Sequence, residues 1–177
     1  MKHFLPILPA LILAACGAES DQIDPVDPAE TATPREIHER ILVMDSHLDT
    51  PANLSKPDFD IIADNPTRMG QVQVDLPKMQ RGGLDGGFWV IFTPQGPLDE
   101  ASYEAAKQAA LTRSDEIIAM VEAHPDQFEL AYTADDAERI VAEGKRIVFQ
   151  SIENSYPLGT DLTVLEDFYE RGVRLVG

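Results

Sequence analysis

A histidine and an aspartate stand two residues apart at the end of an apolar run. The run at residues 41–46 is followed by His47-Leu48-Asp49. Side chains two residues apart in a strand point to the same face, so the imidazole and the carboxylate converge at the strand's C-terminal end. A neutral imidazole and a carboxylate together suit zinc and related divalent ions. His47 and Asp49 are therefore candidate metal ligands, although so short a pattern needs support from other residues.

A second strand end offers Glu153, which follows the apolar run at residues 146–152. Ligands and catalytic groups of parallel α/β folds gather at the C-terminal ends of the strands. Ser151 and Glu153 share one strand face, so that face turns polar only at its rim. Glu153 is the third candidate metal ligand. Its position alone also fits a solvated loop carboxylate or a helix cap.

Strands alternate with helices along the chain, which predicts a parallel sheet with helical crossovers. An irregular stretch at residues 50–81 interrupts the alternation, and loops of such length are usually functional. The expected strands are residues 41–46, 88–92, 128–132, 146–152 and 173–176, and the expected helices start near Pro34, Asp99, Ala134 and Asp161.

Two α/β architectures produce this alternation, a doubly wound open sheet and a (β/α)8 TIM-type barrel. A closed barrel typically takes about 250 residues, so residues 35–177 can hold about half of one. The last predicted strand runs to the end of the sequence. The chain is therefore either a complete small open-sheet domain or the N-terminal part of a barrel.

The N-terminal residues have the pattern of a bacterial lipoprotein. Residues 1–15 place Lys2 before a short apolar run, which predicts a signal peptide rather than a membrane span. The run ends in Leu-Ala-Ala-Cys16, which resembles a lipobox, so Cys16 is expected to be lipidated. An ordinary secretory signal with an incidental cysteine is the alternative. Residues 16–34 are acidic and contain prolines, and we expect them to form an extended tether.

These features predict a lipid-anchored protein of the bacterial cell envelope, facing the periplasm or held in the outer membrane, with Cys16 as its membrane contact. Cys16 is the single cysteine, so no disulfide forms within the chain. The formal net charge is -17, and the lack of a basic footprint argues against nucleic acid as a partner. The sequence leaves a homodimer open.

Several blocks of sequence resemble the membrane (renal) dipeptidase family of zinc metallopeptidases. They follow the order of the family and cover roughly residues 37–177. The blocks are Asp-Ser-His-Leu-Asp-Thr-Pro at 45–51, Val-Asp-Leu-Pro at 74–77, Gly-Phe-Trp-Val at 87–90, Ser-Ile-Glu at 151–153 and Gly-Val-Arg at 172–174. The resemblance implies that residues 35–177 are the N-terminal part of a (β/α)8 barrel with a site for two zinc ions.

By this resemblance, His47 and Asp49 match ligands of one zinc ion, and Glu153 matches the carboxylate that bridges both ions. Two such cations hold a hydroxide between them and polarise the carbonyl that it attacks. The expected substrate is a dipeptide, and enzymes of the family often accept a D-residue at its C-terminal position. Two further histidines and an aspartate for proton transfer are expected beyond Gly177. The 177-residue chain alone is therefore expected to be inactive.

One loop departs from the resemblance. Residues 154–157 read Asn-Ser-Tyr-Pro, where many relatives have glycines. The loop would border the substrate, which makes Tyr156 a candidate substrate-binding residue and leaves the preferred dipeptide open. Asn53 is a further candidate for the wall of the cleft.

Other conspicuous residues have structural interpretations. We expect Asp75 to be a cap or loop anchor, and Phe88 and Trp89 to be core aromatics. The remaining histidines are interpreted as surface or capping residues; they are His3, His38 and His124.

Two other functions fit the same residues. A different metal-dependent amidohydrolase, acting on a lactone or an amide, would share the His-x-Asp pattern after its first strand. A non-catalytic envelope lipoprotein would keep part of the fold for ligand binding.

A half barrel exposes unpaired strand edges and an uncovered apolar interior. We therefore expect residues 35–177, expressed alone, to aggregate or to bind a hydrophobic dye. Size-exclusion chromatography and dye fluorescence test this expectation. A monomer that unfolds cooperatively would contradict it.

Overall fold

The computed structural model describes residues 32–67 and 72–177. Residues Pro34–Gly177 are one unit by their mutual contacts. His3, Cys16, the signal peptide and most of the tether lie outside the described residues, so what the sequence predicts for them stays a prediction. Within the described ranges, no helix combines the length and the apolar character that crossing a membrane takes.

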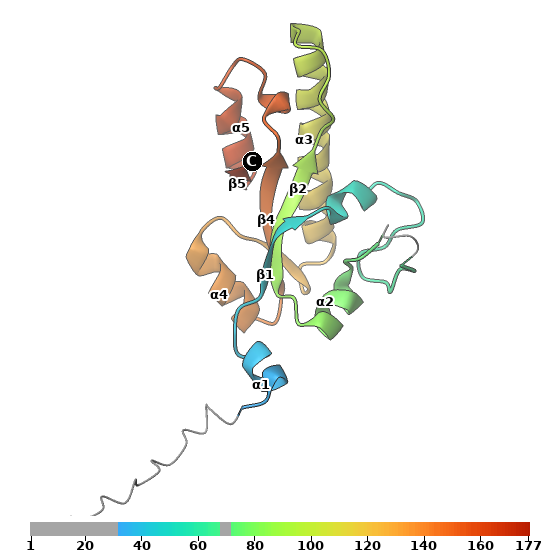
Figure 1. Cartoon of the computed structure of the whole chain (residues 1–177), viewed down its shortest axis with the longest axis vertical. Helices are drawn as coiled ribbons and strands as arrows, with labels where there is room; N and C mark the ends of the chain where they lie inside the picture. Colours follow the sequence, from blue (N-terminus) through green and yellow to red (C-terminus); the bar gives the residue numbers. More distant parts are fainter. Residues whose placement is uncertain (1–31, 68–71) are drawn as a thin grey trace, which may run out of the picture. The chain divides into compact units, whose positions relative to one another are not determined.

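Five strands of the described residues form one parallel sheet (Figure 1). The sheet is built on β4, whose residues 147–152 are all buried. β4 pairs with β2 along one edge and with β3 and β5 along the other. The strands are β1 (Met44–Leu48), β2 (Gly86–Phe92), β3 (Phe128–Leu130), β4 (Arg146–Glu153) and β5 (Val173–Val176).

The order of the strands distinguishes the two predicted architectures. β1, β2, β4 and β5 lie side by side in sequence order, and the short β3 pairs only with the first residues of β4. A doubly wound sheet reverses its order at a switch point, whereas a barrel adds each strand on the same side. The N-terminal part of a barrel is thereby confirmed, and the doubly wound alternative is wrong.

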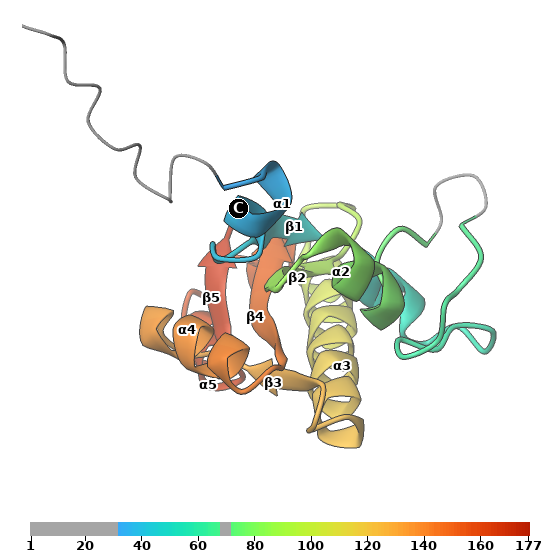
Figure 2. The same ribbon diagram turned by 90° about the horizontal axis from the view of Figure 1, so that it is seen from below.

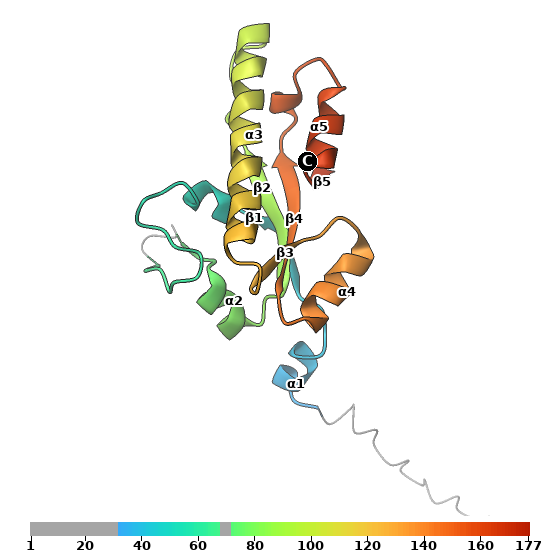
Figure 3. The same cartoon turned by 180° about the vertical axis from the view of Figure 1, so that it is seen from behind.

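Helices α3 (Glu100–Ala123) and α4 (Ala134–Ala142) cover opposite faces of the sheet (Figure 2). α3 runs along β2, as the view from behind shows (Figure 3), and packs through Ile117 against the face that carries Trp89. α4 packs through Ile140 against Phe149 on the other face. The second face is open near the C-terminal end of β2, where Phe92 is exposed.

The caps expected from the sequence begin both helices. The Asp99 side chain accepts a hydrogen bond of 2.8 Å from Ser102 N at the start of α3. Thr133 and Asp136 form a reciprocal capping box at the start of α4. The remaining helical segments are α1 (Pro34–His38), η1 (Thr50–Asn53), α2 (Leu76–Gly82), η2 (Tyr156–Leu158) and α5 (Val164–Glu170).

Two predicted elements begin later in the sequence than expected. The strand expected at 41–46 is β1, which begins at Met44 and includes His47. The helix expected from Asp161 begins only at Val164, because Asp161 Oδ1 accepts hydrogen bonds from the amide and hydroxyl of Thr163 and so forms a turn first.

Apolar side chains remain exposed on the open face and along β5. Phe92 is 52% exposed, Leu175 is 43% exposed and Val176 is 38% exposed. On α5 the buried residues are Val164 and Phe168, whereas Tyr169 is 62% exposed. We expect these exposed apolar side chains to cause the aggregation of residues 35–177 when that segment is expressed alone.

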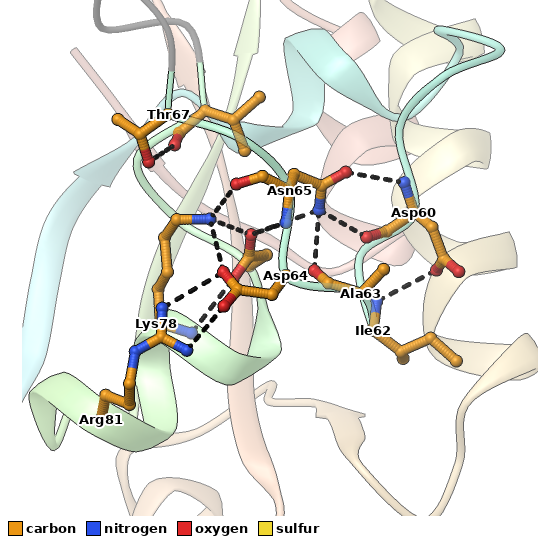
Figure 4. Close-up of polar contacts among 10 residues, drawn as sticks. Asp60, Ile62, Ala63, Asp64, Asn65, Thr67, Lys78 and Arg81 are labelled. Atoms are coloured by element: carbon orange, nitrogen blue, oxygen red, sulfur yellow. Dashed lines mark hydrogen bonds and ion pairs between the residues drawn. The ribbon is translucent and has the colours of Figure 1, made fainter.

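The long loop before α2 is held by a buried carboxylate. Asp75 is 0% exposed and caps α2, because its Oδ1 accepts from Lys78 N at 3.0 Å. Its Oδ2 accepts from Asn65 N at 2.9 Å and forms an ion pair with Lys78 Nζ. Asn65 in turn donates from Nδ2 to the carbonyls of Asp60 and Ala63 (Figure 4). The expected role of Asp75 as cap and anchor is confirmed.

The charge of Asp75 is maintained by these contacts. Burial acts to raise the pKa of the Asp75 carboxyl, but hydrogen bonds from Lys78 and Asn65 outweigh it and hold the pKa below its usual value. Folding therefore favours the ionised form.

Replacing Asp75 by alanine is expected to lower the free energy of unfolding by on the order of 3 kcal/mol, because the Lys78 ammonium and the Asn65 amide lose a buried partner. Chemical denaturation measures the loss. Asp64→Ala removes an exposed carboxylate that pairs with Arg81 and Lys78 and is the matched control, with a much smaller expected loss. Equal losses in the two variants would contradict the assignment.

The same carboxyl predicts a pH dependence. Its lowered folded pKa contributes stability that is present above the unfolded pKa of about 3.9 and is lost as the pH falls through the folded value. Unfolding free energy should therefore fall more steeply in acid for the wild type than for Asp75→Asn.

Candidate metal centre

Three predicted ligands lie together at the C-terminal ends of β1 and β4. His47 Nε2 is 3.3 Å from Asp49 Oδ1 and 3.4 Å from Glu153 Oε2. One ligand atom from each residue lies within 4.8 Å of the other two. The structure thus brings together the three residues that the sequence singled out.

The contact between His47 and Glu153 spans two strand spacings, because β2 lies between β1 and β4. Two spacings amount to roughly 10 Å. The neighbouring residues Leu48 and Ile152 belong to the core under α3, so His47 and Glu153 face the opposite side of the sheet. Both side chains therefore lean toward each other over the end of β2.

The spacing of the donor atoms fits a small divalent cation. Zinc binds imidazole nitrogen and carboxylate oxygen at about 2.0–2.2 Å, so two ligands of a tetrahedral ion lie roughly 3.4 Å apart. The separations of 3.3 and 3.4 Å from His47 Nε2 match this value. The side chains of His47, Asp49 and Glu153 are 49%, 77% and 41% exposed, which leaves room for further ligands and a substrate.

The charge of the cluster also favours a cation. Among the described residues, His47 is the only ion-pair partner of the Asp49 and Glu153 carboxylates. Two acidic groups thus converge without a lysine or arginine between them, and such pairs are stabilised when a cation binds. The donor set of one imidazole and two carboxylates suits zinc.

A cavity of about 410 Å³ lies beside His47 and Asp49. Its wall includes Asn53 from η1 and Gln73 from the end of the anchored loop. Lys56 is the one cation of the lining, and its Nζ donates to Asn53 Oδ1 at 2.6 Å. The volume is in the range of small-molecule sites. Sequence reasoning missed Lys56 because it lies in an irregular loop that no periodicity or motif marks.

Asn154, in the loop after Glu153, has a structural role. Asn154 adopts a φ of 55°, which asparagine tolerates better than most residues. Its side chain donates to Thr93 O and accepts from Tyr156 N, both at 3.0 Å. Tyr156 is 8% exposed, and its hydroxyl donates to Pro97 O at 2.8 Å. These contacts hold two loops together, and contact of Tyr156 with substrate stays a prediction.

The other candidate residues lie outside the cluster. His38 Nε2 is 3.2 Å from a backbone carbonyl, and His124 is the C-cap of α3, as expected for capping histidines. Trp89 is fully buried, and Phe88 stacks on Phe149 with ring centroids 5.1 Å apart. Both aromatic residues therefore pack with the core, as predicted.

Known proteins are similar in sequence to part of this chain. Dipeptidase tcpJ of Claviceps purpurea is 30% identical over 115 residues, which are 63% of this chain and 27% of that protein. Dipeptidase ataJ of Aspergillus terreus is 32% identical over 108 residues, which are 58% of this chain and 26% of that protein. The chain therefore spans about a quarter of the length of these curated relatives.

Solved structures give the same result. The probable dipeptidase PvdM from Pseudomonas aeruginosa superposes with a TM-score of 0.70 and 34% identity, over 81% of this chain and 36% of that one. A metallo peptidase from Rhodobacter sphaeroides, liganded with a phosphinate mimic of the dipeptide L-Ala-D-Ala, superposes with a TM-score of 0.60 and 26% identity. That match covers 77% of this chain and 45% of the other.

The sequence profile of one family matches residues 31–177, which are most of the chain. It is the family described as membrane dipeptidase (peptidase family M19). Solved structures of dipeptidases, one of them described as a member of family M19, superpose on the sheet and helices of this chain. The chain thus belongs to the membrane dipeptidase family.

Proposed function

We propose that this chain is the N-terminal part of a zinc-dependent dipeptidase and that it supplies His47, Asp49 and Glu153 to a site for two zinc ions. The observation that carries the proposal is the convergence of these three side chains from β1 and β4 onto one face of the sheet. Family membership supports the reaction class.

Each residue has a distinct part in this site. His47 offers a neutral ring nitrogen, and Asp49 offers a carboxylate oxygen from the same strand end. Glu153 has two oxygens and can therefore contact two ions at once. When bound, the zinc ions supply a Lewis acid for the scissile carbonyl and a lowered pKa for the attacking water. The half-exposed side chains keep this point of the sheet accessible to a substrate.

The substrate class is inferred from the relatives. Their names describe dipeptidases, and the Rhodobacter sphaeroides protein holds a mimic of L-Ala-D-Ala. A dipeptide with a D-residue at its C-terminal position is therefore the first compound to assay.

We also propose that the protein is anchored in the bacterial envelope through a lipid on Cys16. The support is the sequence pattern alone, a short apolar run that ends in Leu-Ala-Ala-Cys16 and an acidic stretch after it.

Zinc-loaded full-length protein is expected to hydrolyse L-Ala-D-Ala, and His47→Ala and Glu153→Gln are each expected to lower kcat/KM by more than about 100-fold, because outer-shell changes in metal sites already cost 10–100-fold. A coupled amino acid assay and metal analysis check both points. Asp58→Ala removes an exposed carboxylate outside the cluster and should leave activity unchanged.

The assay separates the alternatives. Turnover of lactones without turnover of dipeptides would favour a different amidohydrolase. The absence of both bound zinc and turnover would favour a non-catalytic lipoprotein. Either of these two results would contradict the dipeptidase.

Cys16→Ser is expected to move the protein from the membrane fraction to the soluble fraction of the producing bacterium, because lipid attachment requires the thiol. Cell fractionation with immunoblotting measures the shift, and incorporation of a labelled fatty acid tests the modification directly. Wild-type membrane association of the variant would contradict anchoring at Cys16.

A further inference from the structure

β1 is irregular at the point where it presents His47. Asp45 pairs with Gly87 and Leu48 pairs with Trp89, so β1 takes three steps where β2 takes two. β1 therefore contains one extra residue, which makes a β-bulge at residues 46 and 47.

The bulge sets the face to which His47 points. In a regular ladder continued from the pair before the bulge, His47 would lie opposite Trp89. Paired residues of neighbouring strands point to the same side, so the imidazole would enter the core beside that fully buried ring. With the extra residue, Leu48 takes the place opposite Trp89 and joins the core, and His47 turns to the face of Glu153.

Asp45 satisfies a backbone group at the bulge. A bulged residue is left out of the ladder, and its N–H then needs another acceptor. His47 N donates to Asp45 Oδ1 at 2.9 Å. The side chain two residues earlier thus fixes the backbone of the residue whose imidazole lies between the two carboxylates.

The partner strand leaves space for this arrangement. A Cβ atom built on Gly87 would lie 2.2 Å from Asp45 O, a separation that no side chain accepts. Only glycine allows β1 to approach β2 so closely where the bulge begins.

We propose that Asp45 is a positioning residue of the metal centre, which holds the bulge that turns His47 toward Glu153. Asp45 is not a member of the ligand cluster and acts through the His47 backbone. The inference rests on the proposed function, because it concerns how one of the proposed zinc ligands is aimed.

The test compares four variants of the full-length protein. Asp45→Ala removes the acceptor. Asp45→Asn keeps an oxygen at the same position without the charge, and Asp45→Glu keeps the charge but moves the acceptor by one methylene. Asp58→Ala removes an exposed carboxylate elsewhere and controls for net charge. Zinc affinity is measured by competition with a chelator, and cobalt(II) in place of zinc reports ligand geometry through its visible spectrum.

We expect Asp45→Ala and Asp45→Glu to bind zinc about 10–100-fold more weakly than wild type and to shift the cobalt spectrum. Asp45→Asn and Asp58→Ala should resemble wild type in both measurements. This pattern identifies the hydrogen bond, rather than the charge, as the effective interaction. Should Asp45→Ala fail to fold, the comparison of Asp45→Asn with Asp45→Glu makes the same distinction.

Wild-type affinity and spectrum in Asp45→Ala or Asp45→Glu would overturn the positioning role. An Asp45→Asn variant that binds as weakly as Asp45→Glu would also overturn it, because the retained oxygen would then be without effect. A wild-type protein that binds neither zinc nor cobalt would instead overturn the proposed function.

Discussion

The continuous parallel pairing of β2 with β4 is the constraint on which the rest of this structure depends. Seven consecutive pairs, from Gly86 with Ile147 to Phe92 with Glu153, hold the two strands in register. The last pair brings Glu153 level with the end of β2. Because β4 is buried along residues 147–152 and lies between packed layers, its register cannot slip without exposing its apolar side chains. The position of the carboxylate is therefore a consequence of core packing.

The position of the histidine has a different origin. β1 joins the other edge of β2, so a regular strand would bring His47 into the core next to Trp89. One extra residue in β1 exchanges the faces of Leu48 and His47, and the core gains an aliphatic side chain where it would otherwise hold an imidazole. Bulges next to functional sites commonly re-aim a side chain in this way. The same bulge satisfies packing on one face and ligand geometry on the other.

The wall beside this cluster depends on a buried ion pair. Asp75 and Lys78 tie the long loop to the start of α2, and the end of that loop contributes Gln73 to the cavity beside His47. The residues that these hydrogen bonds hold, such as Asn65 and Asp75, lose less order on ligand binding than free residues would, because their backbone is already fixed. The described residues of this irregular segment thus have a defined structure where they border the site.

Local signals in the sequence predicted the helices that begin with Asp99 and Thr133, because an N-cap side chain and the backbone N–H from which it accepts lie within one turn of each other. The family blocks identified His47, Asp49 and Glu153, since residue types and spacing are properties of the chain. The sequence by itself did not determine the strand order, the start of β1 or its bulge. Each of these depends on which strand lies alongside and which face the core occupies. Only the tertiary structure fixed them, because pairing and burial join residues about 100 positions apart, as in His47 and Glu153.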